Sequence, residues 1–332
     1  MVETDIQAQK TLMVLLRRGL GFSAGEALPC AEGVDWNAVL GIARRQAVTG
    51  ILYAGLQTVE EPLPIPEDTL FLLVALISRI EKKGKALDAF SARFTASLRE
   101  EGWHPLVLKG PEVARLYPSE LLRESGDLDL WLPEDEWNRF EAARPLWKKA
   151  PDGSLQWVAD GVPVDLHRRY FDLSCRKRFL PEVPSSEATL LMLSAHIRKH
   201  CMGSGVGLKQ ICDMAVAYSR LPYDREKLMD IYNRTGTLRW NRLLAAFLEA
   251  YLHCRDHPFL PGELPSPQPL ASIVFSGGDQ GQYAPGRTES LRSSSGRRKW
   301  DTFRRMARRV PFSLRYAPGE LLPYLGTLLR NQ

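Results

Sequence analysis

Hydrophobic and polar positions along this chain follow two different spacings, and the spacing changes twice. In the first hundred residues hydrophobic side chains recur every three or four positions, most clearly over 70–98, which predicts a long helix with one buried face. Asp35 is placed to cap an earlier helix, which is expected to run to about Leu56. We therefore expect a helical N-terminal region over residues 1–101.

The second stretch, residues 102–184, has shorter periods that are typical of an αβ core. Short strands are predicted at 104–108, 127–132, 155–159 and 162–168, and helices at 111–117 and 134–149. The last two strands flank Asp160-Gly161, a dipeptide that favours a tight hairpin turn. These strands are the part of the chain from which a small sheet can form.

The helical spacing then returns and continues for most of the remaining chain. A helical domain is expected over 185–261, beginning with a helix capped by Ser185 or Ser186. Residues 262–298 are rich in Pro, Gly and Ser, which favours a mobile connection. The final region, 262–332, is expected to combine this connection with basic helical stretches at 300–309 and 321–329. The predicted fold class is α+β, mostly helical.

Composition places the chain among soluble globular proteins. It has 332 residues, of which 44% are hydrophobic and 25% charged, and this length is enough for two domains. The longest hydrophobic run, 70–77, is too short to cross a bilayer, and the acidic N-terminus gives no sign of a signal peptide. The five cysteines form no CxxC pair, so neither a disulfide framework nor a zinc knuckle is indicated. A reducing cytoplasm is the simplest setting.

Charge is unevenly distributed along the chain. The formal net charge is +5, yet residues 287–315 hold ten Lys or Arg against two acidic residues. The rest of the chain is therefore slightly acidic. This basic segment predicts contact with an acidic protein partner, nucleic acid or anionic lipid, with a solvated helix as the alternative.

Asp127 and Asp129 form the first candidate site. They stand two positions apart on a predicted strand, so both carboxylates project from the same face. Two such charges repel each other unless a cation lies between them, and Mg²⁺ is a hard ion that prefers oxygen ligands. Acidic pairs at strand ends are nevertheless common, so the pair by itself describes a solvated strand end equally well.

Two neighbouring features favour the site. Asp165 lies on another predicted strand, where its side chain alternates with inward-facing hydrophobic residues. A third carboxylate on an adjacent strand completes a set that can hold two metal ions about 4 Å apart. Lys109-Gly110 lies where a strand meets a helix, and a glycine there lets a phosphate approach the backbone.

The motifs of the predicted core together resemble the polymerase-β nucleotidyltransferase superfamily. They are Val107-Leu108-Lys109-Gly110, then Arg123, then Gly126-Asp127-Leu128-Asp129-Leu130, then Val164-Asp165-Leu166-His167. The chain is similar above all to a bacterial group of uncharacterised nucleotidyltransferases, whose helical domain is resembled by residues 194–200 and 208–215. The resemblance covers roughly residues 100–260. The combination of motifs is specific, although each motif alone is not.

The resemblance implies a short mixed sheet with flanking helices and a helical domain that closes over the nucleotide. It also implies transfer of a nucleoside monophosphate from an NTP, such as ATP, with Mg²⁺ or Mn²⁺ as cofactor. In this interpretation Asp127 and Asp129 hold both metal ions, while Asp165 binds the metal that activates the acceptor oxygen.

Phosphate contact is expected from Lys109, Gly110 and Arg123 in the same interpretation. Arg123 is either a counter-ion of the two carboxylates that follow it or a phosphate clamp, and we favour the clamp. Pro111 departs from the family, which has a second small residue after the glycine, because it removes one backbone donor. The site therefore depends more on the two basic side chains.

Several other residues are candidates for contact with the nucleotide. They are His167, Lys199 and Lys209. His196 and His200 stand four apart on one helix, but without a third ligand nearby in the sequence they are better explained by packing or hydrogen bonding than by zinc. Asp213 is expected to orient a neighbour, and Trp131 to be buried, with stacking on a base as the alternative.

The sequence leaves two classes of function open. One is a nucleotidyltransferase whose acceptor is a small molecule, a protein side chain or an RNA end; phosphoryl transfer could use the same metal site. The other is a non-catalytic or regulatory partner-binding protein on the same scaffold, for which Pro111 and the basic segment are the motivation. The three carboxylates argue for the enzyme.

Overall fold

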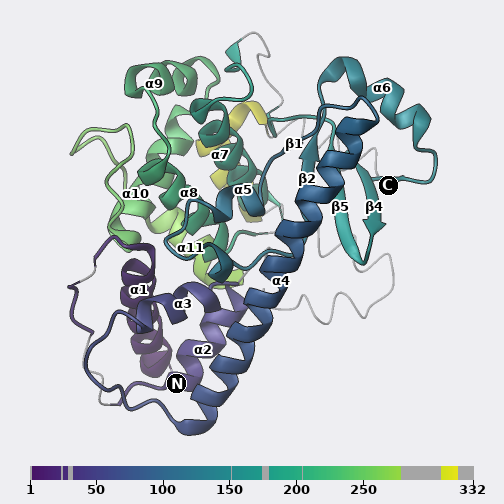
Figure 1. The fold of residues 1–332 in the computed structure, drawn as a ribbon. Helices are drawn as coiled ribbons and strands as arrows, with labels where there is room; N and C mark the ends of the chain where they lie inside the picture. Colours follow the sequence, from purple (N-terminus) through teal and green to yellow (C-terminus); the bar gives the residue numbers. More distant parts are fainter. Residues whose placement is uncertain are drawn as a thin grey trace.

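Helices make up most of the molecule, and one small sheet lies to one side of them (Figure 1). The computed structural model describes residues 2–23, 25–28, 33–150, 152–173, 179–203, 205–277 and 308–320. Within these residues the predicted class, α+β and mostly helical, is confirmed. No helix in this part of the chain combines the length and the hydrophobicity that crossing a lipid bilayer requires.

Three helices form the N-terminal bundle: α1 (Val2–Leu20), α2 (Trp36–Arg45) and α3 (Thr49–Leu56). Asp35 caps α2 as predicted, since its Oδ1 accepts a hydrogen bond of 3.0 Å from the backbone N–H of Ala38. The prediction of one helix as far as Leu56 was wrong. Ala47 adopts a left-handed conformation with φ 52°, which breaks the helix and lets α3 turn back against α1.

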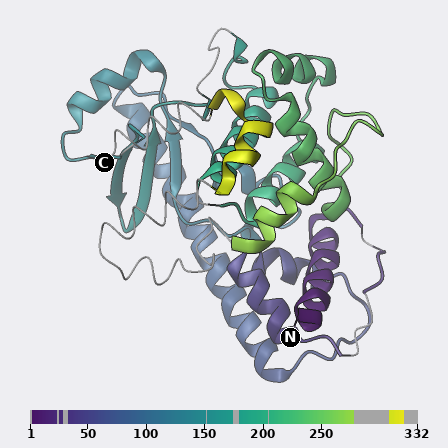
Figure 2. The same cartoon turned by 180° about the vertical axis from the view of Figure 1, so that it is seen from behind.

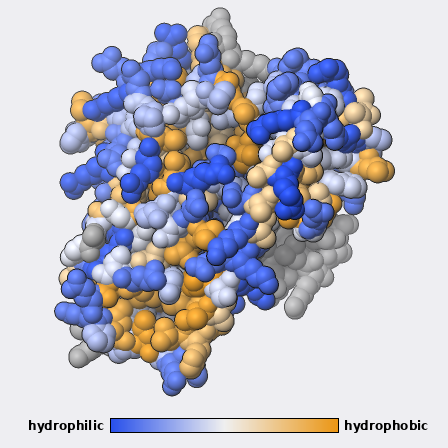
Figure 3. Space-filling view, viewed as in Figure 1, coloured by the Kyte–Doolittle hydropathy of each residue, from blue (hydrophilic) through white to orange (hydrophobic). Residues whose placement is uncertain are grey.

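The long helix α4 (Glu67–Glu100) joins this bundle to the sheet. Its 34 residues span about 50 Å. Leu87, Phe90 and Leu98 on its second half are buried with the sheet's core residues, as the hydrophobic spacing predicted. At its beginning, hydrophobic side chains remain on the surface, among them Phe71 at 66% exposure, and hydrophobic residues gather in this lower part of the molecule (Figure 3).

The sheet has strand order β1-β2-β5-β4-β3. The strands are β1 (Leu106–Val107), β2 (Leu128–Trp131), β3 (Lys148–Lys149), β4 (Leu155–Ala159) and β5 (Val162–His167). The central pair, β2 and β5, is parallel and the other pairs are antiparallel. Asp160 and Gly161 both have positive φ, 50° and 77°, which is the tight hairpin turn that the dipeptide predicted.

The two faces of the sheet have opposite character because side chains alternate along its strands. Leu128 and Leu130 of β2 and Val164 and Leu166 of β5 are fully buried in a core shared with α4 and α6 (Glu134–Ala143). The residues between them in sequence, which include Asp129 and Asp165, project from the other face. That face is directed towards the helices that follow in the chain, where Lys109 beside the sheet meets His196.

Three predicted elements have different boundaries. The helix predicted at 111–117 is a single turn, α5 (Pro111–Ala114), followed by tight turns to Tyr117. The helix predicted to reach Lys149 ends at Ala143, because Arg144 precedes a proline and is kept out of the helical conformation. The predicted connection contains a helix, α11 (Gln268–Gly277), whose Leu270 and Val274 are fully buried.

The region predicted as a helical domain, 185–261, contains α7 (Ser186–Met202), α8 (Leu208–Arg220), α9 (Arg225–Arg234) and α10 (Leu238–Leu252), and α11, which follows it, packs beside α10. Ser185 caps α7 through a 3.1 Å hydrogen bond from the N–H of Ala188. A helical stretch at 308–316, yellow in Figure 2, lies against α7. There Arg309 donates to the carbonyls of Cys201 and Gly203, each at 2.9 Å. The helix predicted at 321–329 and most of the basic segment lie outside the described residues.

Candidate active site

Three carboxylates come together on the polar face of the sheet. Asp127 immediately precedes β2, Asp129 lies within it, and Asp165 lies directly opposite Asp129 on the parallel strand β5. One oxygen from each of the three lies within 4.8 Å of the others. The arrangement predicted from alternation is therefore present, and its donor set suits a hard divalent cation.

The charges of the pair Asp127 and Asp129 are held in different ways. Burial and the neighbouring charge of Asp129 raise the pKa of Asp127 above its ordinary value. Burial also opposes ionisation of Asp129, but the Lys109 ammonium and a hydrogen bond from His167 outweigh it, so the pKa of Asp129 is lowered. Asp129 is thus held in its ionised form. An added cation would do most for Asp127, because its ionised form is the one that its surroundings disfavour.

Two basic side chains contact Asp129 from opposite sides. Lys109 Nζ lies 3.2 Å from its Oδ1, and His167 Nε2 lies 2.6 Å from the same oxygen. On the neighbouring strand, the side-chain amide of Gln156 donates a 2.8 Å hydrogen bond to Asp165 Oδ1. The carboxylates are therefore oriented by the protein itself, which is the condition for a preorganised site.

Gly110 allows the Lys109 loop to pass close to the beginning of β2. Its φ is 66°, a conformation that residues other than glycine rarely adopt. A Cβ at this position would lie 3.4 Å from the carbonyl oxygen of Asp127, at the close limit of an ordinary contact. The glycine predicted for phosphate approach is thus favoured here chiefly by the backbone conformation, with the carboxylate loop close beside it.

Arg123 has a different partner from the one expected. It is buried and binds Asp213 of α8 through two parallel hydrogen bonds, Nε to Oδ1 at 2.7 Å and Nη2 to Oδ2 at 2.8 Å. Tyr117 donates a third bond of 2.7 Å to the same carboxylate, whose pKa is lowered because Arg123 outweighs the effect of burial. The counter-ion of Arg123 is therefore Asp213 rather than Asp127 or Asp129, and Asp213 orients a neighbour as predicted.

The loop that carries Arg123 packs against the beginning of α3. The backbone N–H of Thr49 donates a 2.7 Å hydrogen bond to Glu124. Beside it, Gly50 lies so close to the Leu122 carbonyl that a Cβ would be 1.9 Å from the oxygen. The N-terminal bundle therefore helps to position the loop that leads into β2.

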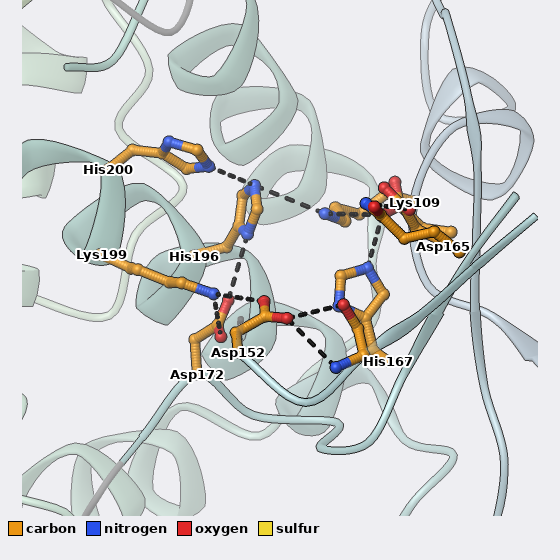
Figure 4. Close-up of polar contacts among 11 residues, drawn as sticks. Lys109, Asp152, Asp165, His167, Asp172, His196, Lys199 and His200 are labelled. Carbon is orange, nitrogen blue, oxygen red and sulfur yellow. Dashed lines mark hydrogen bonds and ion pairs between the residues drawn. The ribbon is translucent and has the colours of Figure 1, made fainter. Parts of the chain in front are cut away.

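A hydrogen-bonded network on α7 continues from Lys109 away from the sheet (Figure 4). His196 Nε2 lies 3.4 Å from Lys109 Nζ and 3.1 Å from Nε2 of His200. On its other side, His196 Nδ1 lies 3.2 Å from Asp172 Oδ2, and Lys199 contacts the same carboxylate at 2.8 Å. The prediction of a hydrogen-bonding role for the two histidines is confirmed.

Burial makes His196 a neutral link in this network. Burial, with the charge of Lys109, lowers the pKa of His196 from 6.5 to about 4, although Asp172 acts in the opposite direction. Its contact with Asp172 is then a hydrogen bond donated by neutral Nδ1–H rather than an ion pair. Its Nε2 consequently carries a lone pair, which faces Lys109 and His200.

A small pocket of about 60 Å³ lies between this face of the sheet and helices α7 and α8. Its lining includes Lys109, Arg123, Asp127, Asp129 and Lys209. Lys209 is close enough for its charge to favour the ionised form of Asp127. Of the predicted phosphate ligands, His167 and Lys199 do not line this pocket. His167 contacts Asp129, and Lys199 contacts Asp172. The pocket has room for phosphate groups and cations but not for a whole nucleotide.

Sequence reasoning missed three members of the site. Gln156 could have been found, because the two-residue turn at Asp160-Gly161 fixes the register that places it opposite Asp165. Asp172 and Asp152, whose side chain lies 3.6 Å from Lys199 Nζ, follow no local pattern. They are near the site only because the connections around β4 and β5 bring them to α7.

Comparison with known families agrees with this geometry. The model of the family described as uncharacterised nucleotidyltransferase matches residues 32–253, which extends the similarity from the core and helical domain back to α2. No curated protein and no solved structure is similar enough to this chain to count as a match. Since the matched region includes the whole three-carboxylate site and more than half of the chain, the protein belongs to this uncharacterised nucleotidyltransferase family.

Proposed function

We propose that the protein transfers a nucleoside monophosphate from an NTP to a hydroxyl or other acceptor, with Mg²⁺ as cofactor and a two-metal site. The observation that carries the proposal is the register of β2 and β5, which sets Asp165 opposite Asp129 and within reach of Asp127. Family membership supports the reaction class.

Asp127, Asp129 and Asp165 would hold the metal. Their oxygens form an all-carboxylate donor set, and burial together with the charge of Asp129 raises the pKa of Asp127, an effect that a bound cation would oppose. When bound, Mg²⁺ supplies positive charge to the triphosphate and to the leaving pyrophosphate. Mn²⁺ has the same ligand preference and is expected to substitute for it.

The side chains around the small pocket would bind the phosphates. Lys109 and Lys209 present positive charge from the loop and from α8, and Arg123 adds charge while fixing the loop through Asp213. Because Lys109 now contacts Asp129, arrival of the metal would free its ammonium to bind a phosphate oxygen. This exchange keeps the charge of the site balanced in both states.

Asp165 is the residue that we assign to the acceptor. It is half-buried on β5 beside Asp129, and Gln156 holds one of its oxygens by a hydrogen bond. The other oxygen is then oriented to receive the proton of an attacking hydroxyl. Asp127 and Asp129 remain on the phosphate side, which separates the two tasks.

The direct test is incubation of the pure protein with each NTP and with Mg²⁺ or Mn²⁺, followed by mass analysis of the protein and of added cell extract. We expect a mass increase of one nucleotidyl group on an acceptor, absent in Asp129→Asn. Asp160→Asn, a change at the exposed hairpin turn, is the matched control and should retain activity. Nucleotide binding without any adduct would instead favour the non-catalytic scaffold.

A further inference from the structure

A second and larger pocket, of about 550 Å³, lies where the parallel strands β2 and β5 end. Its walls come from the last residue of β2, the beginning of α6 and the segment that follows β5. Trp131, Tyr170 and Phe171 provide aromatic surface, and Arg168 and Arg169 provide charge. The volume is within the range of pockets that hold small molecules.

This pocket lies next to the carboxylates, on the side away from the phosphate-binding residues. Trp131 follows Asp129 by two positions on the same face of β2, a distance of about 7 Å along the strand. On the neighbouring strand, Arg168 is the residue directly after His167, which contacts Asp129. The two pockets share no lining residue: Asp127 and Asp129 line the phosphate pocket, and neither of them lines this one.

The aromatic part of the pocket is fixed by packing. The rings of Trp131 and Tyr170 meet edge to face with centroids 5.5 Å apart, and Tyr170 packs against Phe171 at 4.8 Å. Phe171 is buried and Trp131 is half-buried. The pocket therefore offers a firm apolar surface on which a flat or sugar ring can lie.

The charged part contains two neighbouring arginines and one acidic side chain, Glu134 at the beginning of α6, so its net charge is positive. Arg168 and Arg169 are both exposed, and across the described part of the chain neither has a carboxylate within ion-pairing distance. Most other arginines near the site are paired, as Arg123 is with Asp213 and Arg144 with Glu101. Two guanidinium groups beside an aromatic pocket suit an anion such as a phosphate or a carboxylate.

We propose that this pocket binds the acceptor, and that the acceptor is a small molecule with a ring and an anionic group. The inference rests on the proposed nucleotidyl transfer. In-line displacement requires the attacking and leaving groups to lie on opposite sides of the reacting phosphorus. With the leaving pyrophosphate at Lys109 and Lys209, the acceptor approaches from the opposite side, and this pocket begins at Trp131, beyond Asp129 and Asp165 along the two strands.

The base of the NTP is the competing occupant. A base stacked on Trp131 would use the aromatic surface but would leave both arginines without a partner, because nucleobases carry no negative charge. An anionic acceptor uses both parts of the pocket. The arginines therefore favour the acceptor.

The test measures binding by ligand-observed NMR, with phenyl phosphate and benzoate as anionic probes and benzyl alcohol as their neutral counterpart. Each probe is added to the full-length protein, first alone and then with a non-hydrolysable ATP analogue and Mg²⁺. The variants are Arg168→Gln with Arg169→Gln, Trp131→Leu, and Arg255→Gln as a control at an exposed arginine after α10. The two anions distinguish a phosphate-bearing acceptor from a carboxylate-bearing one.

We expect at least one anion to bind at least about tenfold more tightly than benzyl alcohol, and the double arginine variant to lose that advantage. The control should bind as the parent protein does, and the ATP analogue should leave the anion in place. Displacement of the anion by the analogue, together with weaker analogue binding in Trp131→Leu, would assign the pocket to the base and overturn the proposal. Equal binding of anionic and neutral probes would overturn it as well.

Failure of the proposed function has a separate signature. If an anion binds through the arginines but the ATP analogue shows no Mg²⁺-dependent binding, then nucleotidyl transfer is wrong and with it the assignment of the anion as acceptor. Because each probe is measured first without nucleotide and then with the analogue, the two failures are distinguishable.

Discussion

Arg123 and Asp213 form a buried bidentate ion pair that joins the loop before β2 to helix α8. Both side chains are 6% exposed, so neither charge has water to replace its partner. The pair therefore fixes the distance between the carboxylate strand and the helix that carries Lys209. It ties the predicted αβ core to the helical domain.

Loss of one partner should destabilise the protein strongly. Asp213→Asn leaves the Arg123 guanidinium buried without a counter-ion, which typically costs about 3–5 kcal/mol. Urea unfolding followed by circular dichroism measures the change in free energy of unfolding. Asp230→Asn is the control, since Asp230 forms an exposed pair with Arg234 and should change stability by no more than about 0.5 kcal/mol. Equal effects of the two variants would contradict the assigned role.

Gln156 should affect the rate rather than the fold. Gln156→Leu keeps the size of the side chain but removes the hydrogen bond to Asp165, which orients that carboxylate. We expect kcat for nucleotidyl transfer to fall about tenfold, equivalent to about 1.4 kcal/mol in the activation barrier. The affinity for NTP should be unchanged, because Gln156 does not line the phosphate pocket. A loss confined to NTP affinity would show that Asp165 acts on the phosphate side.

The sequence predicted those parts of the site that depend on local periodicity. Alternation along β2 gave the shared face of Asp127 and Asp129, and the hairpin dipeptide set the strand that carries Asp165. A resemblance in motifs added Lys109, which contacts Asp129 and whose phosphate contact stays a prediction. Each of these features is encoded within a few residues, where side-chain direction follows from backbone geometry.

Long-range partners could not be predicted in the same way. Arg123 was expected to serve Asp127 and Asp129 or a phosphate, whereas its partner lies 90 positions away on α8. Nothing in the spacing of either residue reveals this, because ion pairing depends on how segments far apart in the sequence pack together. For the same reason Asp172 was not recognised as the partner of His196.

Substitution of Gly110 tests whether its backbone conformation matters for NTP binding as well as for stability. Gly110→Ala must place a side chain at φ 66° and against the Asp127 carbonyl, so we expect both lower stability, by about 1–2 kcal/mol, and weaker NTP binding. Gly102→Ala is the matched control: its φ is 85°, and a Cβ there meets no atom within 4 Å. The control should lose comparable stability but bind NTP normally, as measured by isothermal titration calorimetry. If both variants bind NTP normally, then Gly110 is required only for its turn.

The buried histidines should make the stability of the protein depend on pH below neutrality. The pKa of His196 is about 4 in the folded protein and about 6.5 when unfolded, and burial lowers the pKa of His200 in the same direction. Between these values the unfolded chain binds protons that the folded protein does not, so stability falls as the pH falls from 6.5 towards 4. The slope from His196 alone is at most about 1.4 kcal/mol per pH unit.

Urea unfolding at pH 7, 6 and 5 measures this slope, and the double variant His196→Gln with His200→Gln should flatten it. Asp172 faces His196 but does not oppose the effect in this window. Its lowered pKa means that its own contribution is lost only at pH values below the ordinary carboxyl range. Arg255→Gln, at an exposed arginine outside the network, is the control and should leave the slope of the parent protein intact. A parent protein whose stability is the same at pH 7 and pH 5 would show that His196 accepts a proton in the folded state, and the neutral link between Lys109 and Asp172 would then be wrong.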